Sequence, residues 1–367
     1  MIYKRFVRPK LFRKDPEEAH EDMLNMLEDW QKSKIKTAAM RALFIKRSNS
    51  LKQHIFGLNF HNPVGMAPGF DKNGRVVNAL ESLGFGFVEV GTVTARPQTG
   101  NQKPRIFRLE KDMALINRLG FNSDGAKAVA ENLKASPPIG IPIGINIGKN
   151  ADVPLDKAAE NYVEALRAIY SYGDFIVINV SSPNTEDLRE LQLAKWLESL
   201  ISLMQKENKA LSQRDQTHKK PLLVKIAPDL TMEQLEETAG VIQKHADGII
   251  VCNTTVSREG LTVDPNEQGG LSGRPLRKLS TQLVAKVYRL THGKVPIIGV
   301  GGIFDSWDAY EKIIAGASLV QVYTGMIYEG PFIARAINAG LLRLMAKDGI
   351  KEISAAVGSK NKMYHDY

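Results

Sequence analysis

The sequence predicts an α/β fold, a TIM (β/α)8 barrel preceded by a small N-terminal helical domain. After residue 60, short β-branched runs alternate with amphipathic helical segments, which is the pattern of repeated strand–helix units around a parallel sheet. Eight such runs are present, and eight strands close a TIM barrel. Spacing does not give the strand order, so a doubly wound open sheet is the structural alternative.

Each expected strand is an apolar run, and each is followed by a segment with helical periodicity. The strands are VGMA from Val64, FVEVGT from Phe87, PIGINIG from Pro142, DFIVINV from Asp174, PLLVKI from Pro221, DGIIVC from Asp247, VPIIGV from Val295 and SLVQVY from Ser318. The helices are expected at about 74–83, 123–134, 156–171, 188–207, 231–245, 276–291, 305–315 and 332–346. With 367 residues, 43% of them hydrophobic, the chain can build a sizeable core.

Residues 1–47 are expected to form a separate amphipathic helical domain, and residues 48–367 the catalytic barrel. Asp15 reads as an N-cap followed by Pro16 at the first helical position, and a second helix is expected over 33–45. A unit this small cannot bury much apolar surface by itself. Its apolar faces must therefore rest on the barrel, on lipid, or on both.

The charge distribution points to an anionic membrane surface. Residues 1–50 hold twelve Lys and Arg against seven Asp and Glu, out of a net charge of +9. The first fourteen residues contain no acid, and their basic residues interleave with apolar ones, a mixture suited to anionic lipid. No apolar run approaches the roughly 18 residues of a spanning helix, so we expect peripheral association. No nucleic-acid-binding motif is present, and we expect no nucleic-acid partner.

A single cysteine, Cys252, allows no internal disulfide and no thiolate metal cluster, so we expect a cytoplasmic location and no metal. The strand ends carry many polar groups, and in a TIM barrel the catalytic residues lie at these carboxyl ends. These groups are Gly69, Asp71, Lys72, Thr92, Asn146, Asn179, Lys225, Asn253, Thr254, Gly301, Gly302, Tyr323 and Thr324.

These groups exclude some chemistries and favour an organic cofactor. None of the seven histidines follows a predicted strand, GGLSG at 269–273 lies in a predicted loop, and HEDML at 20–24 lacks a second histidine. IIGVGGIF at 297–304 and YTG at 323–325 follow the last two strands, where this fold binds phosphate, although tight turns also need glycine. Because GxGxxG is absent, a mononucleotide is favoured over a dinucleotide. Lys225 would need either an anionic partner such as a reduced flavin or a rim carboxylate.

Ten ordered segments spanning nearly the whole chain resemble those of class 2 dihydroorotate dehydrogenases. They are NPVGMAPGFDKNG (62–74), GTVTARPQTGNQKPRIFRL (91–109), INRLGFNSDG (116–125), GINIGKN (144–150), NVSSPNT (179–185), VKIAPDL (224–230), CNTTVSR (252–258), GGLSGRPL (269–276), PIIGVGGI (296–303) and AGASLVQVYTG (315–325). The resemblance implies an FMN-containing TIM barrel that oxidises (S)-dihydroorotate to orotate in pyrimidine biosynthesis. It further implies electron transfer to a membrane quinone at the cytoplasmic face of the inner membrane, and we expect a monomer.

The resemblance also implies roles for particular residues. Ser182 would be the base that takes the C5 proton of dihydroorotate, with Ser181 as the alternative. The substrate would contact Lys72, Asn117, Arg118, Leu119, Gly120, Phe121, Asn179, Asn184, Asn253 and Thr254. FMN would contact Ala67, Pro68, Gly69, Lys72, Thr92, Asn146, Asn179, Lys225, Cys252, Gly273, Gly302, Tyr323 and Thr324, and the quinone passage would use His20, Arg108 and Tyr323.

The chain departs from the family pattern at Cys252, where threonine is usual, at Pro68, where alanine is common, and at Glu186-Asp187, which replaces a glycine-containing loop. Class 1 relatives use a cysteine base and lack the helical front end, so Ser182 and residues 1–47 argue against that class. A phosphate-substrate isomerase would need a catalytic acid pair that the strand ends do not offer. A flavin-binding or membrane-docked scaffold without turnover is the non-enzyme alternative.

Overall fold

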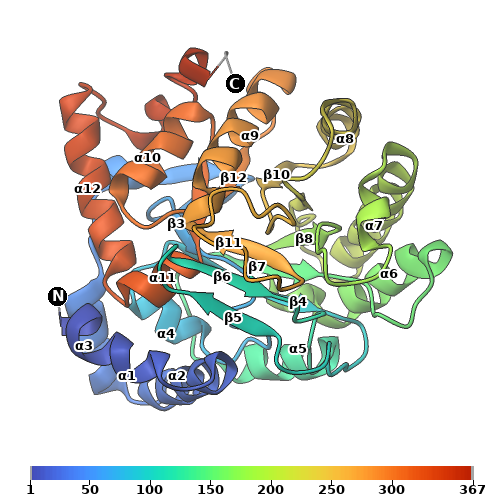
Figure 1. Ribbon diagram of the computed structural model, residues 1–367. Coiled ribbons are helices and arrows are strands. Elements are labelled where there is room, and N and C mark those ends of the chain that lie inside the picture. The colour runs from blue at the N-terminus through green and yellow to red at the C-terminus, as the bar shows by residue number, and fades with distance from the viewer. Residues whose placement is uncertain (1, 365–367) are drawn as a thin grey trace.

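Eight parallel strands close into a barrel in the computed structural model, which describes residues 2–364 (Figure 1). The first strand, β3, pairs with the last, β13, with Val64 opposite Val320. Closure of the sheet confirms the predicted barrel and shows that the doubly wound alternative was wrong. The strands are β3 (Val64–Met66), β4 (Phe87–Val93), β7 (Ile143–Ile147), β8 (Phe175–Asn179), β9 (Leu222–Ile226), β10 (Gly248–Val251), β12 (Ile297–Val300) and β13 (Leu319–Val322).

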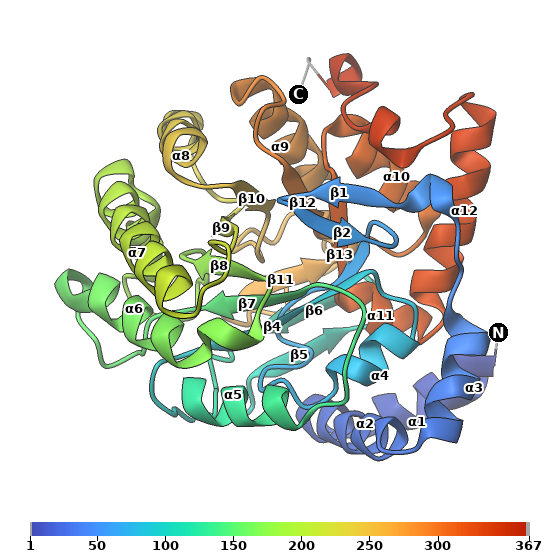
Figure 2. The same cartoon turned by 180° about the vertical axis from the view of Figure 1, so that it is seen from behind.

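Helices surround the barrel on its outer side, as the views from front and back show (Figures 1 and 2). They are α4 (Val77–Ser82), α5 (Ala126–Ala135), α6 (Ala158–Ile169), α7 (Ala194–Arg214), α8 (Met232–His245), α9 (Arg277–Leu290), α10 (Ser306–Ala315) and α12 (Ile333–Lys347), with the short α11 (Thr324–Glu329) after β13. All eight predicted helices are present. The boundary at 188 was wrong, because Leu188–Gln192 forms a separate 3-10 helix before α7.

The barrel interior changes from apolar to polar along the strands. Alternate residues of a strand share a face, so Phe87 and Glu89 of β4 both point inward, as do Leu223 and Lys225 of β9. The apolar layer contains Phe60, Phe87, Phe175, Val177, Leu223, Ile250, Ile298 and Leu319. Phe60 comes from a hairpin, β1 (Gln53–Ile55) and β2 (Leu58–Phe60), that precedes the barrel. The chain thus packs one end of the barrel with hydrocarbon and leaves polar side chains at the other.

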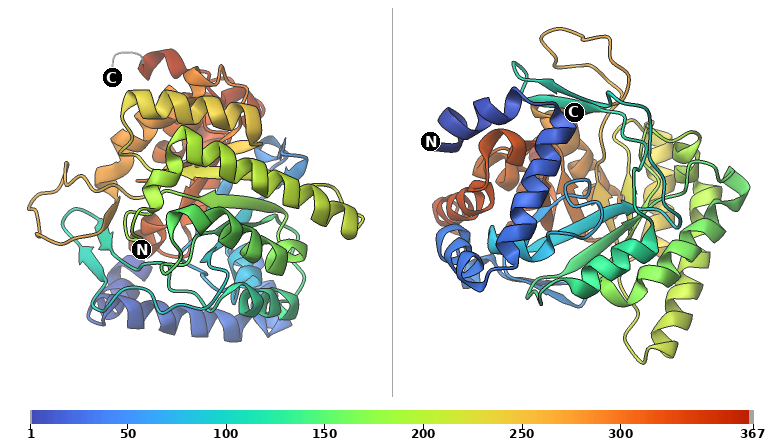
Figure 3. Two further views of the ribbon diagram at one scale, coloured as in Figure 1. Left: turned by 90° about the vertical axis from the view of Figure 1, so that its right-hand side faces the viewer. Right: turned by 90° about the horizontal axis from the view of Figure 1, so that it is seen from below.

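A small antiparallel sheet lies outside the barrel and was not predicted. It consists of β5 (Ile106–Leu109), β6 (Ala114–Asn117) and β11 (Gly270–Gly273), in the order β11-β6-β5. The GGLSG string was expected in a loop, but Gly270–Gly273 pairs with β6 in register, with Gly270 opposite Asn117. The loop leading into β11 projects from the body of the molecule (Figure 3).

The N-terminal segment folds into helices that pack on one side of the barrel (Figure 1). After a π-helical turn at Tyr3–Val7 come α1 (Arg8–Phe12), α2 (Pro16–Gln31) and α3 (Lys34–Phe44). The predicted N-cap is confirmed, because the Asp15 carboxylate accepts a hydrogen bond from the Glu17 amide at 2.8 Å. The inner faces of α2 and α3 join the main core through Leu24, Leu27, Met40 and Phe44.

Ion pairs complete the docking of α2. The guanidinium of Arg75 contacts Glu21 at 2.6 Å and Glu28 at 2.9 Å, and that of Arg105 contacts Glu17 at 2.6 Å. Other apolar side chains of the segment remain exposed to solvent, namely Ile2, Phe6, Val7, Met26, Ile35 and Leu43. Within residues 2–364, no helix combines the length and the apolar character needed to cross a bilayer.

Candidate active site

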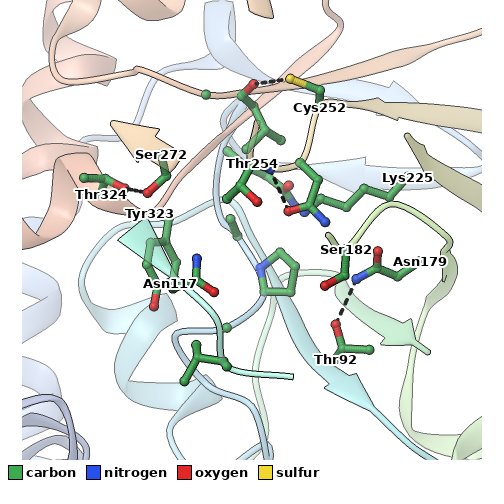
Figure 4. Close-up of a pocket in the computed structure, with 18 of the residues that line it drawn as sticks. Thr92, Asn117, Asn179, Ser182, Lys225, Cys252, Thr254, Ser272, Tyr323 and Thr324 are labelled. Atoms are coloured by element: carbon green, nitrogen blue, oxygen red, sulfur yellow. Dashed lines mark hydrogen bonds between the residues drawn. The ribbon is translucent and has the colours of Figure 1, made fainter. Parts of the chain in front are cut away.

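A cavity opens at the carboxyl ends of the barrel strands (Figure 4). Most of the residues singled out by sequence line it. They are Ala67, Pro68, Gly69, Lys72, Thr92, Asn117, Leu119, Gly120, Phe121, Asn179, Ser182, Asn184, Lys225, Cys252, Asn253, Thr254, Gly273, Gly302, Tyr323 and Thr324. Strands far apart in sequence therefore converge on one site, which lies where this fold places its catalytic groups.

Four predicted site residues do not line this cavity. Arg118 turns away and pairs with Glu267 at 2.7 Å. Asn146 lies behind the wall, where its side chain is bonded to Thr92, Asn179 and Glu89. His20 and Arg108, proposed for a quinone passage, belong to α2 and β5.

Ser182 is the serine of NVSSPNT that faces the cavity (Figure 4). Its side chain is 5% exposed, and its Oγ accepts a hydrogen bond from the Asn184 amide at 3.2 Å. Ser181 is fully buried, with its hydroxyl donated to Asn179 Oδ1 at 2.9 Å while it accepts from Asn253 Nδ2 at 3.0 Å. Among the described residues, neither hydroxyl bonds to a histidine or a carboxylate. Ser182 is thus the hydroxyl available to a bound molecule, and Ser181 is a structural link.

Asparagine amides and hydroxyls form one wall of the cavity. Asn179 Nδ2 donates to Thr92 Oγ1 at 2.9 Å, and the Asn253 carbonyl accepts from the Thr254 amide at 2.8 Å. Asn184 Nδ2 lies 3.4 Å from Asn117 Oδ1 across the opening. Amides offer both donors and acceptors, so this wall suits a flat ring with alternating N–H and C=O groups.

Lys225 provides a buried cation at the floor. It is 4% exposed, and within residues 2–364 its ammonium makes no hydrogen bond and no ion pair. Burial lowers the pKa of Lys225, while the nearby charge of Glu89 acts in the opposite direction. The sequence offered a carboxylate as the alternative partner of Lys225, and Glu89 is such a carboxylate, although it lies below the rim and acts as a nearby charge. A cation that keeps its donors free fits a ligand with an anionic or carbonyl edge.

Glycines after β12 and β13 make a close turn at another edge of the cavity. Gly302 has φ +69°, and a Cβ there would lie 2.4 Å from the Arg277 backbone. Beneath this turn, fully buried Lys312 donates to Ser280 Oγ at 2.5 Å and to Thr281 Oγ1 at 2.8 Å. Ser280 Oγ in turn donates to the Gly301 carbonyl at 3.1 Å. A close glycine turn linked through Ser280 to a buried ammonium suits a phosphate group.

The groups between the cavity and α2 carry strongly shifted pKa values. Lys72 donates to the Gly69 carbonyl at 3.0 Å, and burial lowers its pKa to about 8. Burial likewise lowers the pKa of His20 to about 3, and its buried Nε2 has no partner among the described residues. The His20 ring packs on Phe70 with centroids 5.2 Å apart. His365 lies outside the described residues.

Sequence reasoning missed part of the lining and the layer beneath it. The additional lining residues are Asn122, Ser272, Leu276 and Gln321, whereas Val300, Gly301, Ile303 and Gly325 belong to the two segments predicted to bind phosphate. Gln321 and Glu89 sit inside apolar strands, at positions whose alternation with Leu319 and Phe87 directs them inward. A polar residue within a buried strand was the signal that could have found both.

Comparisons with known proteins agree with this geometry. Residues 50–345 match the family model described as "Dihydroorotate dehydrogenase". The chain is 47% identical over 355 residues to the "Dihydroorotate dehydrogenase (quinone)" of Gloeobacter violaceus, covering 96% of this chain and 98% of that one. It is also 47% identical over 343 residues to the protein of that name from Christiangramia forsetii, covering 93% and 99%. A crystal structure of DHODH from Eimeria tenella in complex with ferulenol superposes with a TM-score of 0.84 at 41% identity, covering 95% of this chain and 96% of that one.

Proposed function

The chain belongs to the dihydroorotate dehydrogenase family, and we propose that it is a quinone-dependent enzyme that oxidises (S)-dihydroorotate to orotate in pyrimidine biosynthesis. The observation that carries the proposal is one cavity that combines the cavity-facing hydroxyl of Ser182, a wall of asparagine amides and the Lys225 ammonium, which has no bonded partner within residues 2–364. The near-complete coverage of quinone-dependent relatives supports the choice of acceptor.

FMN is the cofactor that the cavity fits. The glycine turn at Gly301 and Gly302, with Lys312 beneath it, would hold the phosphate. Lys225 would meet the carbonyl edge of the ring system, and Thr92 and Asn179 its polar rim. When bound, FMN would supply an acceptor for the hydride leaving C6 of the substrate and pass the electrons on to quinone.

The protein's own part in the reaction is to bind, orient and deprotonate. Asn117, Asn184 and Asn253 would hold the flat pyrimidine through amide hydrogen bonds, and Lys72 would meet its carboxylate. The Ser182 oxygen would take the proton from C5 while the C6 hydride departs. A serine is a weak base, so it depends on the acidity of a carbon next to a carbonyl and on a water-poor site.

The N-terminal helices, taken as residues 1–47, would provide access to the membrane quinone. Exposed Ile2 and Phe6 lie in a fourteen-residue stretch that contains basic residues and no acid, although Lys4 pairs with Glu329 at 2.5 Å. This composition favours shallow insertion into anionic lipid at the cytoplasmic face. Arg108 donates to the Phe12 carbonyl at 3.2 Å and to the Lys14 carbonyl at 2.7 Å, so it ties this segment to β5. His20, Arg108 and Tyr323 remain the proposed polar groups of the quinone passage.

One anaerobic experiment tests the proposal. The purified protein should be yellow, should bleach on addition of dihydroorotate, and should recover its colour on addition of a short-chain quinone. A colourless protein that does not take up FMN would contradict the assignment. A yellow protein that dihydroorotate does not bleach would instead favour a flavin-binding scaffold without turnover.

A further inference from the structure

Glu89 is a carboxylate buried inside the barrel that the proposed chemistry leaves without a role. It is 0% exposed and does not line the cavity. Its Oε1 accepts a hydrogen bond from Asn146 Nδ2 at 2.6 Å, and its Oε2 accepts from Gln321 Nε2. Both oxygens are thus used by side-chain amides, one on each side of β4.

An ionised carboxylate has no donor, so both amides must turn their NH2 groups toward Glu89. Their carbonyl oxygens must then point away from it. Gln321 Oε1, in a residue that lines the cavity, is buried and has no partner among the described residues. Asn146 Oδ1 accepts from Thr92 Oγ1 at 2.6 Å and from Asn179 Nδ2 at 3.0 Å.

The orientation of the Asn146 amide determines the orientation of each following hydrogen-bonding group along the cavity wall. Since Asn179 uses its NH2 on Asn146 and Thr92, its carbonyl oxygen faces Ser181 and accepts that hydroxyl. Ser181, having donated its proton, can only accept from Asn253, whose NH2 lies 3.0 Å away. Asn253 therefore directs its own carbonyl to the Thr254 amide. Each group in the series has one arrangement that avoids opposing two donors or two acceptors.

We propose that Glu89 is a positioning residue that fixes the donor and acceptor directions of the amide wall and floor, and thereby sets which hydrogen-bonding pattern of substrate the cavity accepts. The inference rests on the proposed function for the identity of the substrate. It adds that the substrate ring is recognised indirectly, through the carboxylate of Glu89, which does not line the cavity. The Lys225 ammonium is a charge of opposite sign that lies near enough to interact with Glu89.

The first test is Glu89→Gln in the flavin-loaded protein, with orotate affinity measured by calorimetry. A glutamine offers one acceptor and one donor, so one of the two neighbouring amides must reverse and present a donor where an acceptor stood. We expect orotate to bind roughly tenfold to a hundredfold more weakly, the range for a mismatched buried hydrogen bond. Unchanged affinity would overturn the proposal.

The double variant Glu89→Gln/Asn146→Asp supplies the rescue. The glutamine introduced at position 89 can donate to the carboxylate introduced at position 146 and accept from Gln321. That new carboxylate can accept from Thr92 and Asn179, as the Asn146 carbonyl does in wild type. The amide and hydroxyl orientations from Asn179 onward are therefore restored. Orotate affinity should recover to within about threefold of wild type, because the remaining loss is smaller than the contribution of one ordinary hydrogen bond. A double variant that binds no better than the single one would contradict the proposal.

The variant Asn146→Leu distinguishes between two roles of Glu89, namely orienting the amide groups and balancing the charge of Lys225. This variant keeps Glu89 and Lys225 but breaks the series at its first link, and Asn146 does not line the cavity. The proposal expects weakened orotate binding of the same order as in Glu89→Gln. If Glu89 serves only to balance Lys225, Asn146→Leu will bind orotate normally, and that result would refute the role proposed here.

Flavin content and thermal midpoint are recorded for every variant. A merely structural role predicts that affinity follows the thermal midpoint and that the double variant gains nothing. If Glu89→Gln does not fold, the double variant tests the proposal. It keeps one buried carboxylate and the same pattern of hydrogen bonds, so the proposal requires that it folds and binds orotate. Bleaching of the wild-type protein by dihydroorotate tests the proposed function separately, so the two failures can be told apart.

Discussion

The barrel mouth and the N-terminal helices are held by different interactions. In the mouth, polar groups such as Asn179 and Ser181 are buried and satisfy one another. On α2, the ion pairs are partly open to water, with the Arg75 side chain 24% exposed and that of Glu21 55% exposed. Salt and acid weaken exposed pairs far more than buried hydrogen bonds. The chain combines a preorganised site for chemistry with a docking segment whose attachment responds to conditions.

The largest expected effect lies in the mouth. Ser182→Ala should slow flavin reduction by dihydroorotate about 10²–10⁴-fold, the usual contribution of a general base, with the cofactor retained. Stopped-flow absorbance measures the rate. Ser181→Ala is the matched control and should act mainly on affinity, because that hydroxyl links Asn179 to Asn253 and does not face the cavity. If Ser181→Ala slows reduction more than Ser182→Ala, the two serines have been assigned the wrong roles.

The second largest effect is expected on orotate affinity when the charge of Lys72 is removed. Lys72→Met should weaken orotate roughly tenfold to a hundredfold, as expected for a hydrogen bond to a charged group. In wild type the Lys72 pKa is about 8, and the ammonium is the form that binds an anion. Affinity should therefore decline as the pH rises through 8, and this decline should be absent from Lys72→Met. Identical pH profiles for the two proteins would show that Lys72 does not meet the carboxylate.

A moderate effect is expected at the exposed N-terminus. Phe6 is 58% exposed, and Phe6→Asp should reduce binding to anionic vesicles and quinone turnover on them roughly tenfold, since burying a phenyl ring is worth about 1.5–3 kcal/mol. Bleaching by dihydroorotate should not change. Met232→Asp is the control, because Met232 is exposed on α8, on the opposite side of the barrel (Figure 1). Equal losses in both variants would argue against a specific membrane-facing segment.

The smallest effect concerns pH and the docking of α2. Burial depresses the His20 pKa to about 3, so on acidification the unfolded chain binds a proton before the folded one does. The free energy of unfolding should fall by about 2 kcal/mol or less between roughly pH 7 and pH 5, measured by urea titration. His20→Phe should lack this loss. Below the ordinary carboxylate range a further loss should follow, because arginine partners hold the pKa values of Glu17 and Glu28 low.

The sequence was sufficient for the barrel because its signals are local. Each strand is a short β-branched run, and Asp15 and Pro16 mark the start of α2 as observed. The antiparallel sheet was not predicted, because β6 and β11 lie far apart in the chain and Gly270–Gly273 has no strand-like composition. Its pairing depends on tertiary contact, which propensity does not report.

The cavity was predictable to the extent that strand ends meet at one face. Thr92, Ser182 and Lys225 come together as this rule requires, whereas Asn117 reaches the cavity from β6, outside the barrel. Arg118 does not line the cavity, although its neighbours Asn117 and Leu119 do, because its side chain pairs with Glu267. A carboxylate in a buried strand signalled that Glu89 points inward, but its role could not be predicted because its partners lie on β7 and β13, far away in the chain.

The pairing of β3 with β13 has a consequence for biosynthesis. Val64 leaves the ribosome long before its partner Val320, so the ring of strands stays open until β13 has been made. Tyr323 and Thr324, which complete the cavity, emerge later still. A nascent chain therefore has no finished pocket before Thr324 has emerged, and the proposed FMN can be captured only after that point.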